Sequence, residues 1–433
     1  MLQLFLIAFR NLGTHRRRTL LLGGAIAGVT ALLVILMGLS TGMKDTMLRS
    51  ATTLATGHVN VGGFYKVTAG QSAPVVTGYP KIIEQLRKDV PELDYVVQRG
   101  RGWVKMVSET ASQQVGLGGL DIQAEPGLRQ VLQMREGSLD ALTEPNTVLI
   151  FEKQAKRLEV KVGDTVTLSA PTLRGTNNTV DVRVAAIAAN VGLLSDFNVF
   201  VPNATLRSLY QLKDDTTGAI QLYLKDVSQV QAVQARLRET LAASGYQLMD
   251  NDPRAFFMKF EVVNREGWTG QKLDITNWED EISFINWTLT ALNGLTGVLI
   301  FVLLVIICVG IMNTLWIAIR ERTREIGTLR AIGMQRTRVL AMFVFEALTL
   351  GLLGTVAGAV VGLAVCLGIN AADVSVPEVV AVFIMSDTLN LAVNPGSVIG
   401  AMVFITACTT AISLIPSFLA ARMKPVTAMH HIG

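Results

Sequence analysis

Apolar residues gather in four long stretches of this 433-residue chain, which are separated by segments of ordinary polarity. The stretches are residues 19–42, 287–319, 339–370 and 398–421. A helix that crosses a bilayer needs roughly 20 mostly apolar residues, and all four stretches reach that length. The pattern therefore predicts an α-helical membrane protein with four transmembrane helices.

The second stretch is longer than a bilayer requires. Residues 287–319 would form a helix about 50 Å long at 1.5 Å per residue, against a hydrocarbon core of roughly 30 Å. Residues 277–281, just before it, are polar and mostly acidic. We therefore expect this transmembrane helix to continue beyond the membrane as a stalk.

The segment between the first two stretches has the composition of a soluble domain. Residues 43–286 contain 26 Lys and Arg against 28 Asp and Glu. The residue spacing predicts helices at 79–89 and 228–243 and strands at 93–97, 180–184 and 220–224. Gly163-Asp164 predicts a β-hairpin turn between alternating apolar residues at 160–162 and 166–168. We expect a large α+β domain between the first and second helices.

The positions of the basic residues predict the topology. Lys and Arg are concentrated in residues 1–18, 320–338 and 422–433, whereas residues 371–397 contain neither. Basic residues in short loops mark the cytoplasmic side of a membrane. We therefore expect cytoplasmic termini, a cytoplasmic loop at 320–338, and an outer location for the large domain and the short 371–397 loop.

The N-terminal segment, residues 1–18, combines a short apolar run with Arg16, Arg17 and Arg18. It is too short to cross a bilayer, so we expect an interfacial helix on the cytoplasmic surface. A basic start followed by an apolar run is also typical of a secretory signal peptide. The run at 19–42 exceeds the roughly 7–15 residues of such a signal, and we interpret it as a permanent anchor.

Composition narrows the class of protein further. Half of the residues are hydrophobic and 17% are charged, whereas soluble proteins carry roughly 25% charged residues. These values exclude a disordered chain, and the net charge of +4 gives no reason to expect nucleic-acid binding. Cys308, Cys366 and Cys408 all lie in apolar runs, so we expect buried free thiols rather than disulfides.

The sequence contains none of the common catalytic motifs. It has no phosphate-binding Gly-x4-Gly-Lys-Ser/Thr loop, no His-Glu-x2-His, no Cys-x2-Cys and no Gly-x-Ser-x-Gly. The adjacent His430 and His431 are better explained as part of a flexible tail than as a metal site. We therefore expect no catalytic, cofactor-binding or metal-binding residues, and a chain that is not itself an enzyme.

Two apolar stretches contain regularly spaced glycines. Gly354, Gly358 and Gly362 recur every fourth residue in the third stretch, and Gly24 and Gly28 do so in the first. Small residues on one helix face allow membrane helices to approach closely. The spacing predicts helix packing, either within this chain or between two subunits, and does not separate the two.

Glu346 is the one acidic residue well inside an apolar stretch. A carboxylate within a membrane is costly and is a candidate for function, such as proton transfer. Glu346 lies near the cytoplasmic end of the third stretch, where an arginine or a neighbouring helix could satisfy it. We favour this structural role over proton-coupled transport.

The cytoplasmic loop contains a short amphipathic segment. Its charged residues are interleaved with apolar ones at helical spacing, and Gly333 can end a helix. Arginines in the loop follow from topology alone, but the interleaved apolar residues predict docking to a partner. The candidate contact residues are Arg322, Arg324, Glu325, Ile326, Gly327, Leu329, Arg330, Ala331, Gly333 and Met334.

This segment also carries a family resemblance. Residues 322–333, Arg-Thr-Arg-Glu-Ile-Gly-Thr-Leu-Arg-Ala-Ile-Gly, closely resemble the signature of FtsX-like permeases, the superfamily of MacB, the lipoprotein-release subunits LolC and LolE, and FtsX. Other parts of the same pattern are resembled by residues 345–348 with the glycines that follow, by 416–426, and by 8–12 and 16–19. Over the large domain the resemblance is looser.

The resemblance implies a MacB-like periplasmic core domain at 43–286 and a dimeric permease in a bacterial inner membrane. It also implies that a coupling helix within 320–338 is seated on a cytoplasmic ABC ATPase dimer. MacB has a fused nucleotide-binding domain, whereas this sequence lacks its phosphate loop. ATP and magnesium are therefore expected on a partner ATPase, as in the LolC and LolE systems, with no cofactor in this chain.

The family further implies a mechanotransmission complex, which moves its periplasmic part and acts on a lipoprotein or other hydrophobic cargo. Expected partners are a second permease, identical or homologous, a cargo, carrier or adaptor, and membrane lipid. One alternative is an efflux permease that works with a periplasmic adaptor and an outer-membrane channel. Another is an FtsX-like regulator of cell-wall hydrolases or of signalling, without cargo.

Overall fold

The computed structural model describes residues 16–422 apart from residues 69, 284–285, 322, 378–379, 382–385 and 387. The expected interfacial helix at 1–18 lies almost entirely outside the described residues, and so does the tail that contains His430 and His431. The described chain divides into two compact units. The helical unit contains residues 16–45, 290–375 and 388–422, and the strand-rich unit contains 46–289 and 376–387.

Within the described residues, four helices are long and apolar enough to cross a membrane. They are α2 (Arg16–Ala51), α11 (Asn286–Glu321), α13 (Arg336–Ala371) and α15 (Pro395–Arg422). Each contains one of the predicted stretches, which confirms the four-helix expectation. Helix α11 has 36 residues, about 54 Å at 1.5 Å per residue, so it exceeds the roughly 30 Å of a hydrocarbon core.

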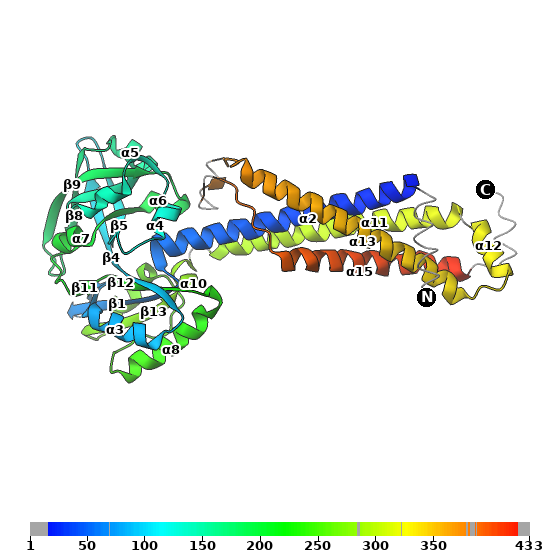
Figure 1. Ribbon diagram of the computed structural model, residues 1–433. Helices are drawn as coiled ribbons and strands as arrows, with labels where there is room; N and C mark the ends of the chain where they lie inside the picture. Colours follow the sequence, from blue (N-terminus) through cyan, green and yellow to red (C-terminus); the bar gives the residue numbers. More distant parts are fainter. Residues whose placement is uncertain are drawn as a thin grey trace. The chain divides into compact units, whose positions relative to one another are not determined.

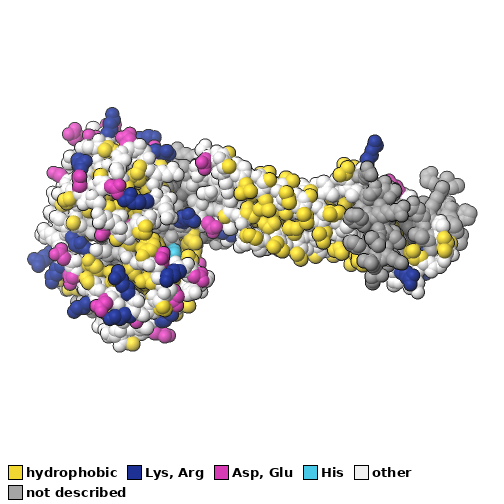
Figure 2. All heavy atoms as spheres, viewed as in Figure 1, with side chains coloured by type: hydrophobic (Ala, Val, Ile, Leu, Met, Phe, Trp, Pro, Cys, Tyr) yellow, Lys and Arg dark blue, Asp and Glu magenta, His cyan; other side chains and the backbone are white. Residues whose placement is uncertain are grey.

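The four long helices lie side by side in the helical unit (Figure 1). Their shared core contains Ile26 of α2, Ile311 of α11, Leu350 of α13 and Ile405 of α15. Most side chains of α11 point away from this core, and Phe301 is 67% exposed. Apolar side chains also dominate the face of the helical unit seen in Figure 2. This outward apolar surface is suited to a lipid solvent.

The strand-rich unit contains a mixed sheet in the order β13-β1-β12-β4-β5-β10-β7-β9-β6, with β2 beside β1 and with β8 beside β4 and β9. Charged side chains are spread over its surface in Figure 2. The strands are β1 (Val59–Thr68), β2 (Gln71–Ala73), β4 (Leu93–Val107), β5 (Ser112–Leu120), β6 (Met134–Gly137), β7 (Thr147–Phe151), β8 (Thr165–Pro171), β9 (Asn177–Ala188), β10 (Asn198–Pro202), β12 (Ala219–Leu224) and β13 (Gly270–Asn277). A separate pair is formed by β3 (Val76–Thr77) and β11 (Thr216–Thr217).

The long strand β4 belongs to two lobes. Its first half pairs with β12, and its second half pairs with β5 and β8. Lobe A consists of β1, β12, β13 and the first half of β4, covered by α3 (Tyr79–Asp89) and α8 (Val230–Ala243). Its β-α-β-β-α-β order, with β13 and β1 beside β12 and β4, is the ferredoxin-like arrangement.

Lobe B is inserted between β4 and β12 and contains β5 to β10. Its core is formed by aliphatic side chains of several strands, among them Val104, Val148 and Val199, all fully buried. The short helices of this lobe are α4 (Leu128–Val131), α5 (Glu152–Leu158), α6 (Gly192–Phe197) and α7 (Asn203–Tyr210). Beyond β12 the chain returns to lobe A, where α9 (Phe260–Arg265) and α10 (Trp278–Glu281) flank β13.

The local predictions for this unit are confirmed with one exception. Helix α8 buries the apolar positions Val230, Val233, Leu237 and Leu241, which are the ones that the helical spacing selects. The predicted hairpin around Gly163-Asp164 is wrong. That turn follows helix α5, and β8 instead forms its hairpin with β9 through the turn at residues 172–176.

A buried ion pair holds β4 to the segments that flank it. The guanidinium of Arg99 donates from Nε to Glu125 Oε1 at 3.2 Å, and its Nη2 is ion-paired with Oε2. Arg99 also donates to the carbonyl oxygens of Thr53 and Leu54. Both charged side chains are less than 5% exposed. Burial raises the pKa of Glu125, and Arg99 opposes that rise.

We predict that Arg99→Met destabilises the strand-rich unit by about 3–5 kcal/mol, because Glu125 would remain as an uncompensated buried charge. The matched control is Arg129→Met, which breaks the exposed Arg129–Asp140 pair and should cost about 0–1 kcal/mol. Thermal unfolding of the full-length protein in detergent, followed by tryptophan fluorescence, measures both. Equal midpoints for the two variants would contradict the assigned role of Arg99.

Candidate functional site

The predicted cytoplasmic segment forms a separate helix, α12 (Thr323–Ala331). The helix ends two residues before Gly333, whose φ of +102° lies in the left-handed region that glycine favours. This confirms the expected helix end. Arg322 lies outside the described residues, and so do the side chains of Arg324, Glu325, Ile326 and Leu329.

Helix α12 contacts the ends of the neighbouring long helices. Thr323 Oγ1 donates to the Ile319 carbonyl at 2.9 Å, and Arg330 Nη1 donates to the Ala421 carbonyl, also at 2.9 Å. The second contact places a cation at the C-terminal end of α15, where the helix dipole favours positive charge. These bonds fix α12 against α11 and α15.

The two faces of the α12 region differ in exposure. Gly327 is buried, and Met334 is half-buried against the cluster that contains Phe343. Ala331 and Gly333 are exposed, and Ile332 is 80% exposed. Ile332 thus presents an apolar side chain directly after α12.

The glycines of α13 pack against α2 of the same chain. A Cβ at Gly358 would lie 2.4 Å from the Ala27 carbonyl oxygen, and one at Gly362 would lie 2.9 Å from the Ala31 carbonyl oxygen. A Cβ at Gly354 would lie 2.8 Å from Ile26 Cγ2. Only glycine permits these approaches, so of the two alternatives for these residues the structure shows packing within the chain.

Gly24 and Gly28 are not part of this contact. Both are exposed, and no described atom lies within 4 Å of the Cβ position at either residue. The residues of α2 that face α13 include Gly23, Ala27 and Ala31, one or more positions away from the glycines that the spacing selects. A packing role for Gly24 and Gly28 against another protein stays a prediction.

Glu346 lies on α13 and is 5% exposed. It is one helical turn from Met342 and close in sequence to Phe343, which belongs to the apolar cluster at this end of the helical unit. This burial is compatible with the structural role that we favour for Glu346. That role stays a prediction.

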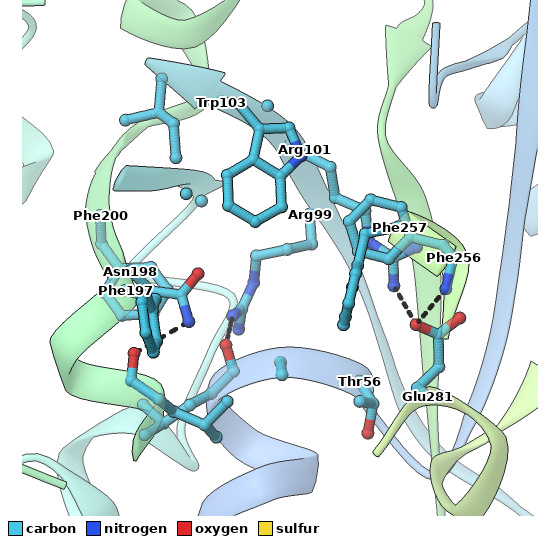
Figure 3. A pocket seen from close by; sticks show the side chains of 18 of the residues that line it. Thr56, Arg99, Arg101, Trp103, Phe197, Asn198, Phe200, Phe256, Phe257 and Glu281 are labelled. Atoms are coloured by element: carbon cyan, nitrogen blue, oxygen red, sulfur yellow. Dashed lines mark hydrogen bonds and ion pairs between the residues drawn. The ribbon is translucent and has the colours of Figure 1, made fainter. Parts of the chain in front are cut away.

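The strand-rich unit contains a cavity of about 350 Å³ that sequence analysis did not find. It lies between lobes A and B, with the middle of β4 forming one wall (Figure 3). Arg99, Arg101 and Trp103 point to one face of β4 because side chains alternate along a strand. The sequence signal was the alternation Arg-Gly-Arg-Gly-Trp at 99–103, with a small residue at every second position.

Arg101 is the buried charge at the centre of this wall. Its Nη2 donates to Asn60 Oδ1 at 3.0 Å and lies 3.8 Å from Glu281 Oε2, and its guanidinium stacks 4.3 Å from the Phe256 ring centroid. Glu281 Oε1 also accepts from Thr276 Oγ1 at 2.7 Å. Burial lowers the pKa of Arg101, and Glu281 and Asp274 oppose that change. A guanidinium nevertheless stays charged.

Trp103 is held in place through its backbone. Tyr210 on α7 donates its hydroxyl to the Trp103 carbonyl and accepts from the Trp103 N–H, both at 2.8 Å. Burial raises the pKa of Tyr210 to about 12, so the hydroxyl keeps the proton that it donates. The backbone of β4 is thereby fixed at Trp103, whose indole ring lines the cavity and is 41% exposed.

Within the part of the chain that the structure describes, no group of three His, Cys, Asp or Glu side chains is placed to hold a metal ion. Arg99 and Arg101 of the cavity wall are ion-paired with Glu125 and Glu281. Among the described residues, we consider two candidate sites of contact with other molecules: the exposed end of α12 and the apolar cavity.

Two models of known protein families match this chain. Residues 19–240 match the family model of the MacB-like periplasmic core domain, and residues 297–425 match that of the FtsX-like permease C-terminal region. The first match alone covers half of the chain. The chain belongs to the FtsX-like and MacB-like family of ABC transporter permeases. Its four apolar helices and the α/β domain between the first two are the expected architecture.

Two relatives of this permease are export proteins by name. It is 34% identical over 121 residues to the macrolide export ATP-binding/permease protein MacB of Nitrobacter winogradskyi, which covers 28% of this chain and 17% of the relative. It is 32% identical over 160 residues to the pyoverdine export ATP-binding/permease protein PvdT of Pseudomonas entomophila. This second match covers 36% of this chain and 22% of the relative. The match thus spans about a fifth of the length of these relatives.

Among solved structures, the periplasmic region of MacB from Actinobacillus actinomycetemcomitans is similar over 53% of this chain and 94% of that one. The TM-score is 0.29 and the sequence identity is 13%. The family assignment therefore rests on the two family models and not on this structural likeness.

We predict that Gly358→Leu prevents the close contact between α13 and α2, because a side chain would overlap the Ala27 carbonyl. Overpacking of this kind costs about 1–3 kcal/mol or more. The matched control is Gly368→Leu in the same helix, where no described atom lies within 4 Å of the Cβ position. Thermal unfolding in detergent, followed by circular dichroism, should show a lower midpoint for Gly358→Leu alone. Two equal midpoints would argue against the observed packing.

Proposed function

We propose that this permease is the transmembrane subunit of an export complex in a bacterial inner membrane, driven by ATP hydrolysis in a partner ABC ATPase. The main observation in support of this proposal is helix α12, which contacts the ends of α11 and α15 and is followed by the exposed Ile332. In this proposal α12 is the coupling helix, and its contact residues are those of the segment 322–334. ATP and magnesium are bound by the partner.

The proposed topology places both termini and α12 in the cytoplasm and the strand-rich unit in the periplasm. The distribution of basic residues supports it, because residues 371–397 contain no Lys or Arg whereas 320–338 contain six Arg. A second permease subunit, identical or homologous, completes the complex. Movements driven by ATP in the cytoplasm are carried to the periplasmic domain through α2 and α11.

The cargo is proposed to be hydrophobic. Lipoprotein release was the first expectation, and efflux of a small molecule was the alternative. The names of the relatives, macrolide export and pyoverdine export, favour small-molecule export. The apolar cavity between the lobes favours it as well, because its volume suits a small molecule rather than a protein.

We predict that Ile332→Asp weakens association with the partner ATPase by about tenfold or more, because a charge would be buried without a partner in an apolar contact. ATP hydrolysis stimulated by the permease should fall with it. Co-purification and ATPase assays in nanodiscs measure both quantities. The control Val67→Asp changes an equally apolar residue, 57% exposed, in the strand-rich unit.

The control variant should bind and stimulate the ATPase as the unmodified permease does. Since Ile332 is 80% exposed, its replacement leaves the fold intact. Full association and stimulation with Ile332→Asp would show that the ATPase does not dock on this end of α12.

A further inference from the structure

Two glycines on β5 line one wall of the cavity between the two lobes. In the antiparallel pairing of β4 with β5, Gly118 lies opposite Arg101 and Gly116 lies opposite Trp103. Directly opposed residues of paired strands project on the same face of the sheet. The space over the two glycines is filled by neighbouring side chains, because a Cβ at Gly118 would lie 2.7 Å from Phe200 Cδ1 and one at Gly116 would lie 2.6 Å from Asn198 Oδ1. The glycines thus let Phe200 and Asn198 pack close to β5, and both side chains line the cavity.

Three aromatic rings at the cavity are incompletely covered by protein. Trp103 is 41% exposed, Phe257 is 37% exposed and Phe197 is 53% exposed. The Trp103 and Phe257 rings meet edge to face at a centroid distance of 6.4 Å, and Figure 3 shows them next to each other, Trp103 from β4 and Phe257 from the short 3-10 helix Phe256–Met258. Rings held in place with open faces can stack on a ligand ring.

The charges in the cavity wall compensate one another. Arg99 is neutralised by Glu125 and bonded to two carbonyls, and Arg101 is paired with Glu281. A ligand carboxylate would have to compete with Glu281 for Arg101, and a ligand cation would meet two arginines. Burying an ion without a partner is costly. The cavity is therefore complementary to an uncharged molecule.

The volume limits the size of that molecule. An engineered apolar cavity of roughly 150 Å³ holds one benzene ring, so a cavity of about 350 Å³ has room for roughly two rings. Trp103, Gly102 and Arg101 also line a neighbouring cavity of about 220 Å³. The indole thus lies at a wall shared by two spaces, where a longer ligand could reach past it.

We propose that the cavity beside Trp103 binds uncharged, ring-containing apolar small molecules. This assignment rests on the proposed export function and names the class of cargo. The ligand stacks on Trp103 and Phe257 and packs against Phe197. The glycines of β5 allow Phe200 and Asn198 to form part of the cavity wall, and the buried ion pairs exclude charged competitors. An acyl chain is the rival occupant, since it is also apolar.

The test is photolabelling of the full-length permease in lipid nanodiscs, without ATPase, by a neutral naphthalene that carries a diazirine. Labelled peptides are then mapped by mass spectrometry. We expect saturable labelling of the segments around Trp103, Phe197 and Phe257, which free naphthalene suppresses more strongly than a fatty alcohol does. Labelling confined to the transmembrane helices, or stronger competition by the fatty alcohol, would overturn the proposal.

Matched variants localise the site. Phe257→Ala should weaken labelling by about tenfold, the loss expected when one ring contact and its apolar burial are removed. Met258→Ala changes the next residue, which is 42% exposed and does not line the cavity, and should label normally. Equal labelling of both variants would contradict the site. Because no ATPase is present, this result is independent of whether α12 couples to a partner.

Discussion

The strand-rich unit depends on keeping two arginines charged inside a protein core. Strand β4 serves both lobes, pairing with β12 in its first half and with β5 in its second. Arg99 and Arg101 lie at this crossing and are 2% and 9% exposed. Glu125 and Glu281 compensate them from segments on either side. Because a buried unpaired charge is so unfavourable, this network fixes how the two lobes meet and thereby defines the cavity between them.

A different constraint operates in the helical unit. In a lipid solvent, burying apolar side chains no longer drives helices together, so close packing decides which helices meet. There, α13 contacts α2 through Gly354, Gly358 and Gly362, whose missing side chains let backbone meet backbone. Polar contacts also join these helices, such as Thr355 Oγ1 with Thr406 Oγ1 at 3.3 Å.

Sequence reasoning succeeded where one periodicity dominates. It located the four apolar helices, the buried face of α8 and the glycine that follows α12. It failed where the answer depends on contacts between distant segments. The turn at Gly163 was predicted correctly, but strand β8, which follows it, pairs with β9 and not with residues 160–162. Gly24 and Gly28 have the right spacing, yet α2 presents Gly23, Ala27 and Ala31 to α13. The cavity was missed because it requires the register of β4 with β5, which one sequence does not reveal.

The central claim is that ATP turnover in a partner moves the outer domain of this permease. The direct measurement uses the reconstituted complex, with the three native cysteines replaced by serine and a spin label at position 161 of each permease subunit. Position 161 is an exposed lysine of the strand-rich unit. The measured quantity is the distance between the two labels. The account predicts that the distance distribution shifts when ATP is added and returns when ATP is exhausted. An unchanged distribution during measured ATP turnover would contradict it.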